Sequence, residues 1–325
     1  MRVLLTGATG FVGSHVVEKL LDHNQEVVAL VRATSDVEHL QTLGVEMVEG
    51  SLGEAEKLRS VLSEIDALIH VAGLTAAPGP DVLYQVNVDG TRDLADHLAE
   101  VADEGTRFIY ISSVAAQGPS RGAKPRSLDE IPRPVSHYGR SKLGGEGAVL
   151  AYRKWLDVTI LRPPAVYGPR DRDMFEVFQL ANRRLAPVIG GEDRWLSIIH
   201  AEDVARAVVA CLKAPGDGEI YPIDDGHCYS WRQLGDLIAQ AVGKQAVTVP
   251  LPEWVFRVAA TASELGGSAL NMTATFNRDK YLEMIQPSWV CGHAEIRDAL
   301  DWEPKWDLAE GARQTAAWYR EQGWL

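Results

Sequence analysis

The chain has 325 residues, of which 46% are hydrophobic and 24% are charged, and its formal net charge at pH 7 is −13. This composition is ordinary for a globular protein, and the length allows one large α/β domain or a domain with a smaller lobe. A surface this negative repels phosphate backbones, so no nucleic acid partner is expected.

The cysteines and the apolar segments indicate the cellular compartment in which the protein works. Cys211, Cys228 and Cys291 are sparse and widely spaced, which fits neither a disulfide framework nor a zinc site, and no metal is expected. No signal peptide is visible, because the first apolar run is too short. The most apolar later stretch, 251–272, carries three charged residues, so no membrane span is expected. The sequence therefore predicts a cytoplasmic protein.

The first half of the chain alternates short apolar runs with longer segments of helical periodicity. The runs that we expect to form strands are 2–5, 26–31, 46–48, 67–70, 108–111 and 158–161. The helices that we expect between them are 12–22, 37–42, 54–62, 81–101 and 137–155. Such alternation predicts an α/β fold with a Rossmann-type, doubly wound parallel sheet and helices on both faces.

A glycine-rich turn follows the first expected strand directly, and it reads Gly7-Ala8-Thr9-Gly10-Phe11-Val12-Gly13. Gly7 permits a tight turn, Gly10 lets the backbone approach a pyrophosphate, and Gly13 packs the helix against the strand. The helix that begins here, with Phe11 and Val12, presents free N–H groups to such an anion. The context predicts a dinucleotide-binding loop, with a turn that binds no ligand as the alternative.

The end of the second expected strand indicates which dinucleotide binds. A carboxylate there would bind the ribose 2′-hydroxyl, whereas an arginine would accept a 2′-phosphate. Arg32 follows the strand directly, and a guanidinium can hold a phosphate by two parallel hydrogen bonds. The sequence therefore favours NADP, with NAD possible; the alternative is an arginine that is only solvated or stacks on the adenine.

Tyr138 and Lys142 lie four residues apart in the expected helix 137–155, so they share one face. An ammonium beside a phenol favours the phenolate and lowers its pKa. Unperturbed tyrosine titrates near about 10, so this help would let it exchange protons near neutral pH. Together with the dinucleotide loop, the pair predicts hydride transfer coupled to proton transfer. Singly, either residue could merely be packed or solvated.

The strict alternation fades in the second half of the chain. We expect short helices at 174–184, 201–213, 231–242, 251–261 and 308–319. Residues 1–169 would form the dinucleotide-binding domain, to which 197–223 returns, and 170–196 and 224–325 would form a smaller substrate-binding lobe. Apolar residues of this lobe would suit a hydrophobic ketone or alcohol, or would form only its core. They are Trp195, Trp254, Val255, Phe256, Leu265, Leu270, Met272 and Phe276.

Together these motifs resemble the extended short-chain dehydrogenase/reductase family of NAD(P)-dependent epimerases, dehydratases and ketone reductases. Within it, the chain is similar to the branch of dihydroflavonol reductases and 3β-hydroxysteroid dehydrogenases. The resemblance covers nearly the whole chain. Beyond the glycine loop it is carried by His70-Val71-Ala72-Gly73, Asn87-Val88-Asp89-Gly90-Thr91, Ser112-Ser113, Tyr138 with Lys142, 162–169 and 200–204.

The resemblance implies a role for each matching position. Ser113 would hydrogen-bond the reacting oxygen, Tyr138 would be the acid/base, and Lys142 would bind the nicotinamide ribose and lower the pKa of the tyrosine. Two hydroxyl groups aimed at a carbonyl oxygen would stabilise the negative charge that develops there. The other expected cofactor contacts are Val71, Ala72 and Gly73 along the adenosine and ribose, Pro163, Ala165 and Val166 along the nicotinamide, and Ser51 and Leu52 after the third strand.

Two departures from the family pattern concern the cofactor and the reaction. Ser51 stands where relatives often have an aspartate that contacts the adenine amine, and a serine accepts that bond more weakly. Val114 and Ala115 stand where sugar-nucleotide dehydratases have an Asp-Glu pair. Two alkyl side chains cannot protonate a leaving hydroxyl, so we set dehydration aside.

A third departure concerns the substrate. Leu196 stands where nucleotide-sugar epimerases often have an arginine that clamps the pyrophosphate, and Arg278 and Lys280 are insecure matches for the second clamp residue. Without two guanidinium groups, a diphosphate substrate loses its strongest anchors. Arginines at other positions could substitute for them, namely Arg170, Arg172 and Arg194.

The sequence thus predicts an NADP-preferring oxidoreductase that interconverts a secondary alcohol and a ketone of a small-molecule substrate. The first alternative is a nucleotide-sugar 4-epimerase, which would use the same serine, tyrosine and lysine with a tightly bound cofactor. The second is a sensor that binds NADP(H) without turnover. The resemblance also implies a homodimer that forms through the helices at 81–101 and 137–155.

Overall fold

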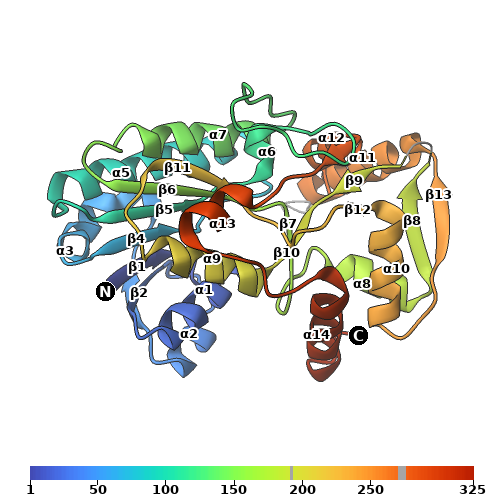
Figure 1. Cartoon of the computed structure of the whole chain (residues 1–325), viewed down its shortest axis with the longest axis horizontal. Coiled ribbons are helices and arrows are strands. Elements are labelled where there is room, and N and C mark those ends of the chain that lie inside the picture. The colour runs from blue at the N-terminus through green and yellow to red at the C-terminus, as the bar shows by residue number, and fades with distance from the viewer. Residues whose placement is uncertain (191–192, 270–275) are drawn as a thin grey trace.

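The computed structural model describes residues 1–190, 193–269 and 276–325. Its centre is a sheet of seven parallel strands in the order β11-β6-β5-β4-β1-β2-β3, which confirms the predicted fold class (Figure 1). The strands are β1 (Arg2–Thr6), β2 (Glu26–Val31), β3 (Glu46–Glu49), β4 (Ala67–His70), β5 (Arg107–Ile111), β6 (Asp157–Arg162) and β11 (Asp217–Pro222).

Helices cover both faces of this sheet because its strands are apolar on both sides. Val3 and Leu5 of β1 belong to a core shared with α1 (Phe11–Asp22) and α9 (Ala201–Cys211), whereas Leu4 belongs to a core shared with α5 (Gly90–Val101) and α7 (His137–Leu150). The shorter helices of this part are α2 (Glu38–Thr42), α3 (Arg59–Leu62), α4 (Pro80–Tyr84) and α6 (Val114–Gln117). The carboxyl ends of the parallel strands meet at one edge, where ligands of such folds bind.

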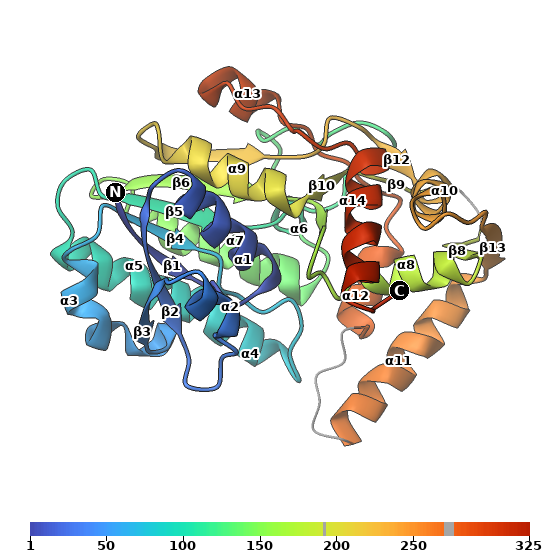
Figure 2. The same cartoon turned by 90° about the horizontal axis from the view of Figure 1, so that it is seen from below.

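Most of the rest of the chain builds a smaller lobe at that end of the molecule (Figures 1 and 2), whereas Ile296 and Trp302 pack into the core of the main sheet. Its core lies among α8 (Phe175–Asn182), α10 (Trp231–Ala241) and α14 (Leu308–Glu321). Its strands form three small sheets: β7 (Ala165–Tyr167) with β10 (Ile198–His200), β8 (Leu185–Ile189) with β13 (Val247–Leu251), and β9 (Trp195–Leu196) between β12 (Tyr229–Ser230) and β14 (Ser288–Trp289). The domain limits given above stay a prediction.

Several elements differ from the sequence-based expectation. The expected helix 81–101 is three segments, because the π-helical turn η2 (Gln85–Asp89) separates α4 from α5. The expected helix 54–62 is the 3₁₀ segment η1 (Leu52–Leu58) followed by α3. The helix α11 (Glu253–Ala269) is longer than expected and projects from the lobe (Figure 2), and α12 (Arg278–Met284) and α13 (Ala294–Leu300) had not been expected. No helix in the described parts of the chain is long and apolar enough to cross a membrane.

Candidate active site

The turn between β1 and α1 is as tightly packed as the sequence predicts. Gly7 has φ +74°, and a Cβ atom built there would lie 2.7 Å from the backbone nitrogen of Ala72. A Cβ atom on Gly13 would overlap the carbonyl group of Gly7. No side chain caps α1 at Gly10, and the first residues of the helix line a large cavity. This arrangement fits a dinucleotide pyrophosphate, because uncapped N–H groups and the helix dipole favour an anion.

The cavity extends from the glycine loop across the carboxyl edge of the sheet into the lobe, and its volume is about 2230 Å³. A typical small-molecule pocket has roughly 300–1,000 Å³, so there is room for a dinucleotide and a second molecule. Every site residue that the sequence predicts lies on its wall. They are Gly7, Gly10, Phe11, Val12, Gly13, Arg32, Ser51, Leu52, Val71, Ala72, Gly73, Ser113, Tyr138, Lys142, Pro163, Ala165 and Val166.

Arg32 and Ser51 line the end of the cavity beside β2 and β3. Arg32 follows β2, is exposed on the cavity wall, and forms no ion pair within the described residues. Its backbone N–H donates to Ser35 Oγ at 3.1 Å, which fixes the turn that carries it. Ser51 Oγ donates to Glu54 at 3.0 Å, so its lone pairs can still accept an adenine amine. These residues fit an adenosine with a 2′-phosphate.

The serine and tyrosine of the predicted catalytic set begin two helices that face the same cavity. Ser113 is the N-cap of α6, and its Oγ accepts a hydrogen bond from Ala115 N at 3.1 Å. Tyr138 is the second residue of α7, whose N-cap is Ser136, with Oγ accepting from Gly139 N at 2.9 Å. Capping of this kind fixes where each helix begins. The two hydroxyl groups are therefore held at the carboxyl edge of the sheet.

Lys142 lies one turn further along α7 and is 4% exposed. Its Nζ donates to the carbonyl oxygen of Ile111 at 2.6 Å and lies 4.4 Å from the ring centre of Tyr110. A Cβ atom on Gly73 would be 3.6 Å from this Nζ, so the ammonium faces the backbone that the resemblance assigns to the ribose. Burial lowers the pKa of Lys142 to about 7.

The sequence predicts that Lys142 lowers the pKa of Tyr138, and the structure does not show this effect. The pKa of Tyr138 is raised, first by burial and then by the negative charge of Glu283. Hydrogen bonding with Ser113 and the positive charge of Lys280 act in the opposite direction, and Lys142 is not among the causes. The physical reason is that the Lys142 ammonium is directed to a carbonyl of β5 and not to the phenol.

A buried ionic network joins α7 to the end of β6, next to the carboxyl edge of the sheet. Arg162, at the end of β6, donates from Nε and Nη2 to the two carboxylate oxygens of Glu146 on α7, at 2.8 and 2.6 Å. Its Nη1 donates to Gln117 Oε1 at 2.6 Å, and Ser112 Oγ also donates to Glu146. The charged groups are thus paired and hydrogen-bonded, as buried charges need to be. The network ties α7 to the strand ends that carry the site.

Asn87 had not been assigned a role from the sequence, and the structure shows what it holds. Its side chain is buried in η2, accepts from Leu74 N at 2.8 Å, and donates to Leu74 O at 2.8 Å and to Ser141 Oγ at 2.9 Å. It therefore fixes the segment after Gly73 against α7. The signals for such a contact were its place in the segment 87–91 that carries the family resemblance and a polar residue in a helical pattern.

The helix α12 holds the start of α7 from the lobe side. The carboxylate of Asp279 accepts from His137 N at 2.7 Å and from Tyr138 N at 2.9 Å. Glu283 Oε1 accepts from Ser136 Oγ at 2.7 Å. Carboxylates at a helix N-terminus satisfy its free N–H groups and complement its dipole. Sequence reasoning missed these contacts, because they join residues about 140 positions apart.

The substrate side of the cavity is largely apolar. Of the lobe residues expected there, Val255, Phe256 and Phe276 lie on the wall, whereas Trp195 and Trp254 do not. The side chain of Leu265 lies outside the described part of the structure, as do Leu270 and Met272. Further apolar residues of the lobe complete the wall, including Val177, Leu180, Ala259, Met284 and Trp289.

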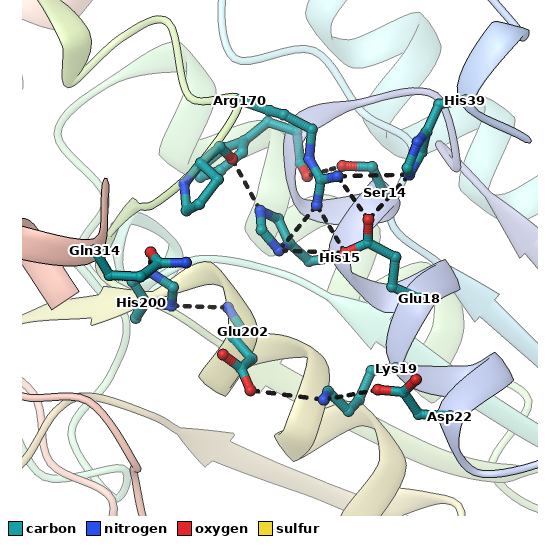
Figure 3. Close-up of polar contacts among 12 residues, drawn as sticks. Ser14, His15, Glu18, Lys19, Asp22, His39, Arg170, His200, Glu202 and Gln314 are labelled. Carbon is teal, nitrogen blue, oxygen red and sulfur yellow. Dashed lines mark hydrogen bonds and ion pairs between the residues drawn. The ribbon is translucent and has the colours of Figure 1, made fainter. Parts of the chain in front are cut away.

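The loop that leaves the sheet after β7 is bound to α1 by Arg170 (Figure 3). Arg170 has φ +75°, and its guanidinium donates to both carboxylate oxygens of Glu18, at 2.7 and 2.9 Å, and to His15 Nδ1 at 3.1 Å. The other ring nitrogen of His15 donates to Pro169 O at 2.9 Å. Burial, and then the charge of Arg170, lower the pKa of His15 to about 4, so its ring is neutral.

The three arginines considered as anchors for an anionic substrate have other contacts. Arg170 is bound to α1 as just described. Arg172 lies on the cavity wall with its guanidinium 5.6 Å from the ring centre of Trp324. Arg194 is 3.8 Å from a carboxylate oxygen of Glu253 and does not line the cavity. Arg170 and Arg172 both line the cavity, and of these two only Arg172 forms no ion pair within the described residues.

Comparison with known proteins gives a consistent set of matches. The model of the NAD dependent epimerase/dehydratase family matches residues 3–223. Ceramide reductase of Caulobacter vibrioides (strain NA1000 / CB15N) is 33% identical over 327 residues, 99% of this chain and 96% of that protein. Sterol demethylase protein B of Methylococcus capsulatus (strain ATCC 33009 / NCIMB 11132 / Bath) is 31% identical over 238 residues, 70% of this chain and 71% of that protein. The solved structure of gox2253 superimposes with a TM-score of 0.83 at 27% identity, covering 100% of this chain and 99% of that chain.

Proposed function

Because the chain belongs to the NAD-dependent epimerase/dehydratase family and is an NAD(P)-dependent enzyme of the extended short-chain dehydrogenase/reductase type, we propose that it interconverts a ketone and a secondary alcohol. Its substrate carries a long alkyl or polycyclic group, and NADP is the preferred cofactor. The observation that carries this proposal is the joint presence of Ser113 and Tyr138 on the wall of a cavity that continues into an apolar lobe. The full-length similarity to ceramide reductase supports a lipid-like substrate.

The residues on the cavity wall account for the chemistry. When bound, the nicotinamide supplies the hydride for reduction or accepts it in oxidation. In reduction, the Tyr138 hydroxyl donates its proton to the carbonyl oxygen, and Ser113 donates a hydrogen bond to the negative charge that develops there. Lys142 would hold the ribose hydroxyls with the N–H donors that its bond to the Ile111 carbonyl leaves free. Pro163, together with the strand that follows it, would bound the nicotinamide.

The arginine after β2 supports NADP as the cofactor. Arg32 is exposed on the wall, forms no ion pair within the described residues, and directly follows β2, where an arginine would accept a 2′-phosphate. Two parallel hydrogen bonds from a guanidinium to a phosphate are about twice as strong as neutral ones. The uncapped start of α1 would hold the pyrophosphate.

A nucleotide-sugar epimerase is less well supported. Leu196 of β9 lines the cavity where such enzymes often have a clamp arginine. Dehydration is disfavoured for a related reason, because Val114 and Ala115 on the same wall carry no proton donor. A sensor without turnover would have no need for Ser113 and Tyr138 beside the cofactor site.

A homodimer through α5 and α7 also stays a proposal, which sedimentation equilibrium would test.

The test is NADPH oxidation with three substrate classes: long-chain ketones, short ketones and UDP-sugars. We expect turnover of the first class only, with no cofactor retained after gel filtration. The Tyr138→Phe variant should lose turnover and keep its affinity for NADPH, because only the proton donor is removed. Turnover of UDP-sugars without net redox change would establish the epimerase instead, and undiminished activity of the variant would remove Tyr138 from the mechanism.

A further inference from the structure

The helix α12 places a lysine and a glutamate on the cavity wall near the predicted proton donor. Lys280 and Glu283 lie one helical turn apart, with Nζ 3.2 Å from Oε2. The side chain of Glu283 is 10% exposed and that of Lys280 is 56% exposed, and both line the cavity together with Ser113 and Tyr138. The reaction described above uses neither charge, so the pair needs another explanation.

The position of the pair relative to the phenol is fixed by contacts between two helices. Asp279, next to Lys280, holds the backbone N–H groups of His137 and Tyr138. Glu283 accepts a hydrogen bond from Ser136, which caps α7. Both charges act on the phenol, because Glu283 raises the pKa of Tyr138 and Lys280 lowers it. A group bound by the pair would therefore lie in the same cavity as the Tyr138 side chain, at the contact between α12 and the start of α7.

The hydrogen-bonding capacity of the pair is only partly used. The Lys280 ammonium has three donors, and Glu283 accepts one of them. The Glu283 carboxylate has about four acceptor sites, and Ser136 and Lys280 occupy two. The pair thus offers both a donor and an acceptor. Its charges cancel, so it suits a neutral polar group better than an anion.

The surroundings of the pair are mostly apolar, apart from Asp173, which also lines the cavity and whose negative charge acts on Lys280 and further disfavours an anion. Phe276, Met284 and Trp289, from the same part of the lobe, line the cavity with Val255 and Phe256. A polar site in an apolar wall discriminates strongly, because an analogue that lacks the polar group leaves the wall's donors and acceptors unpaired. We propose that Lys280 and Glu283 recognise a neutral hydroxyl or amide group next to the reacting carbon of an otherwise apolar substrate. This inference rests on the function proposed above.

The proposed recognition by Lys280 and Glu283 can be tested by measuring ligand binding to the enzyme saturated with the oxidised cofactor. No turnover occurs, because this form has no hydride to give to a ketone. The ligands are a long-chain methyl ketone, its analogue with a hydroxyl group on the methyl carbon, and its analogue with a carboxylate there. Isothermal titration calorimetry should show that the hydroxy ketone binds about tenfold or more tightly than the plain ketone. In Lys280→Met the two affinities should agree within about twofold. Arg278→Met is the matched control, because it removes a cation from the same helix but off the cavity wall, and should keep the wild-type ratio.

Glu283→Gln gives an independent result. The amide can still accept a hydrogen bond from Ser136, but it leaves the charge of Lys280 uncompensated. The carboxylate analogue should therefore bind to this variant about tenfold more tightly than to the wild type. Equal affinity of the two neutral ligands for the wild type, the wild-type ratio retained in Lys280→Met, or no binding of either ligand would overturn the proposal. Ligand discrimination as expected, but without NADPH oxidation, would overturn the oxidoreductase function and leave the recognition site standing.

Discussion

Lys142 combines deep burial with a single strong acceptor, the carbonyl of Ile111 at 2.6 Å. Desolvation penalises its charged form more than that contact and Glu146 compensate, so its pKa falls from 10.5 to about 7. The lysine can therefore lose its proton near neutral pH when no ligand lies beside it. This property has a consequence for stability that can be measured without substrate.

The free energy of unfolding should rise with pH between about 7 and 10 because of Lys142. In this window the unfolded chain binds the proton and the folded chain has lost it, so the slope is positive, at most about 1.4 kcal/mol per pH unit. Urea denaturation of the cofactor-free protein from pH 7.5 to 9.5 measures it. The Lys142→Met variant should lack this contribution, and Lys154→Met, which changes an exposed lysine, should follow the wild type. Parallel curves for the wild type and Lys142→Met would refute the low pKa.

We propose that Arg32 sets the preference for NADP over NAD. Replacing it by alanine removes the cation proposed to hold the 2′-phosphate, so the affinity for NADPH should fall about tenfold or more. The affinity for NADH, which has no such phosphate, should change less than about twofold. Fluorescence titration of both cofactors measures the two dissociation constants. An equal loss for both would mean that the arginine does not contact the phosphate.

That the expected site residues would lie on the wall of one cavity could be predicted from the sequence, because most of them belong to local motifs. Tyr138 and Lys142 are joined by one helical turn, and the glycines of the first loop by a single strand–turn–helix unit. The partners of these residues could not be predicted in the same way. Whether the lysine ammonium faces the phenol or the Ile111 carbonyl depends on packing between α7 and β5, which no local pattern specifies.

Among the helices, α7 is held at two points, its first turn and its third turn. Asp279 and Ser136 hold its first turn, and Glu146 on its third turn pairs with Arg162 of β6. The length of the helix between these points sets where Tyr138 and Lys142 lie. Loss of either anchor should therefore affect the whole helix.

Glu146→Gln should destabilise the protein by about 3–5 kcal/mol, because it leaves the guanidinium of Arg162 buried without a counter-charge. The free energy of unfolding from urea titration gives the measurement. Glu100→Gln is the control, since it removes one partner of an exposed pair, Arg59 and Glu100, and should leave stability unchanged. Similar small effects in both variants would show that the buried network contributes little.

Gly13→Ala should impair both folding and cofactor binding, since the added methyl group overlaps the Gly7 carbonyl. Overpacking at such a site costs about 1–3 kcal/mol, and the displaced loop should lower the affinity for NADPH. Gly147→Ala, on the exposed side of α7 with open space around it, should be neutral or slightly stabilising. Differential scanning calorimetry and NADPH titration compare the two. Normal behaviour of the Gly13 variant would contradict the packing described for the loop.

The six strands expected in the first half of the chain were predicted to within one residue at either end, because buried parallel strands are continuous apolar runs bounded by turns. The seventh strand, β11, was expected only as part of the returning segment 197–223. The bounds of the helices were predicted less well. The expected helix 81–101 is broken where the Asn87 side chain bonds to Leu74, a contact that periodicity does not reveal. The short helix α12 was missed, because its seven residues are mostly polar and its partners lie on α7.

At the scale of the whole molecule, the two parts are joined by polar contacts as well as by the chain. Arg170 connects the start of the lobe to Glu18 and His15 of α1 (Figure 3). Asp279 connects α12 to α7. These contacts lie on either side of the cavity, so the wall is assembled from both parts at once.

A double-mutant cycle on Arg170 and Glu18 should detect the first of these connections. Each single change, Arg170→Met or Glu18→Gln, should lower the free energy of unfolding by about 1–3 kcal/mol, because a charge-assisted hydrogen bond is lost. The double variant should lose less than the sum of the two. Strict additivity in urea denaturation would show that the two residues do not interact in solution.

The pairing of β7 with β10 constrains how this molecule can move. The chain leaves the main sheet through Ala165–Tyr167 and comes back through Ile198–His200, and the two strands are bonded to each other in parallel register. Outgoing and returning segments thus form one ribbon, so the lobe cannot swivel freely on a single tether. Because the chain also passes between the two parts after β11 and on either side of α13, any displacement of the lobe would have to bend several connections together.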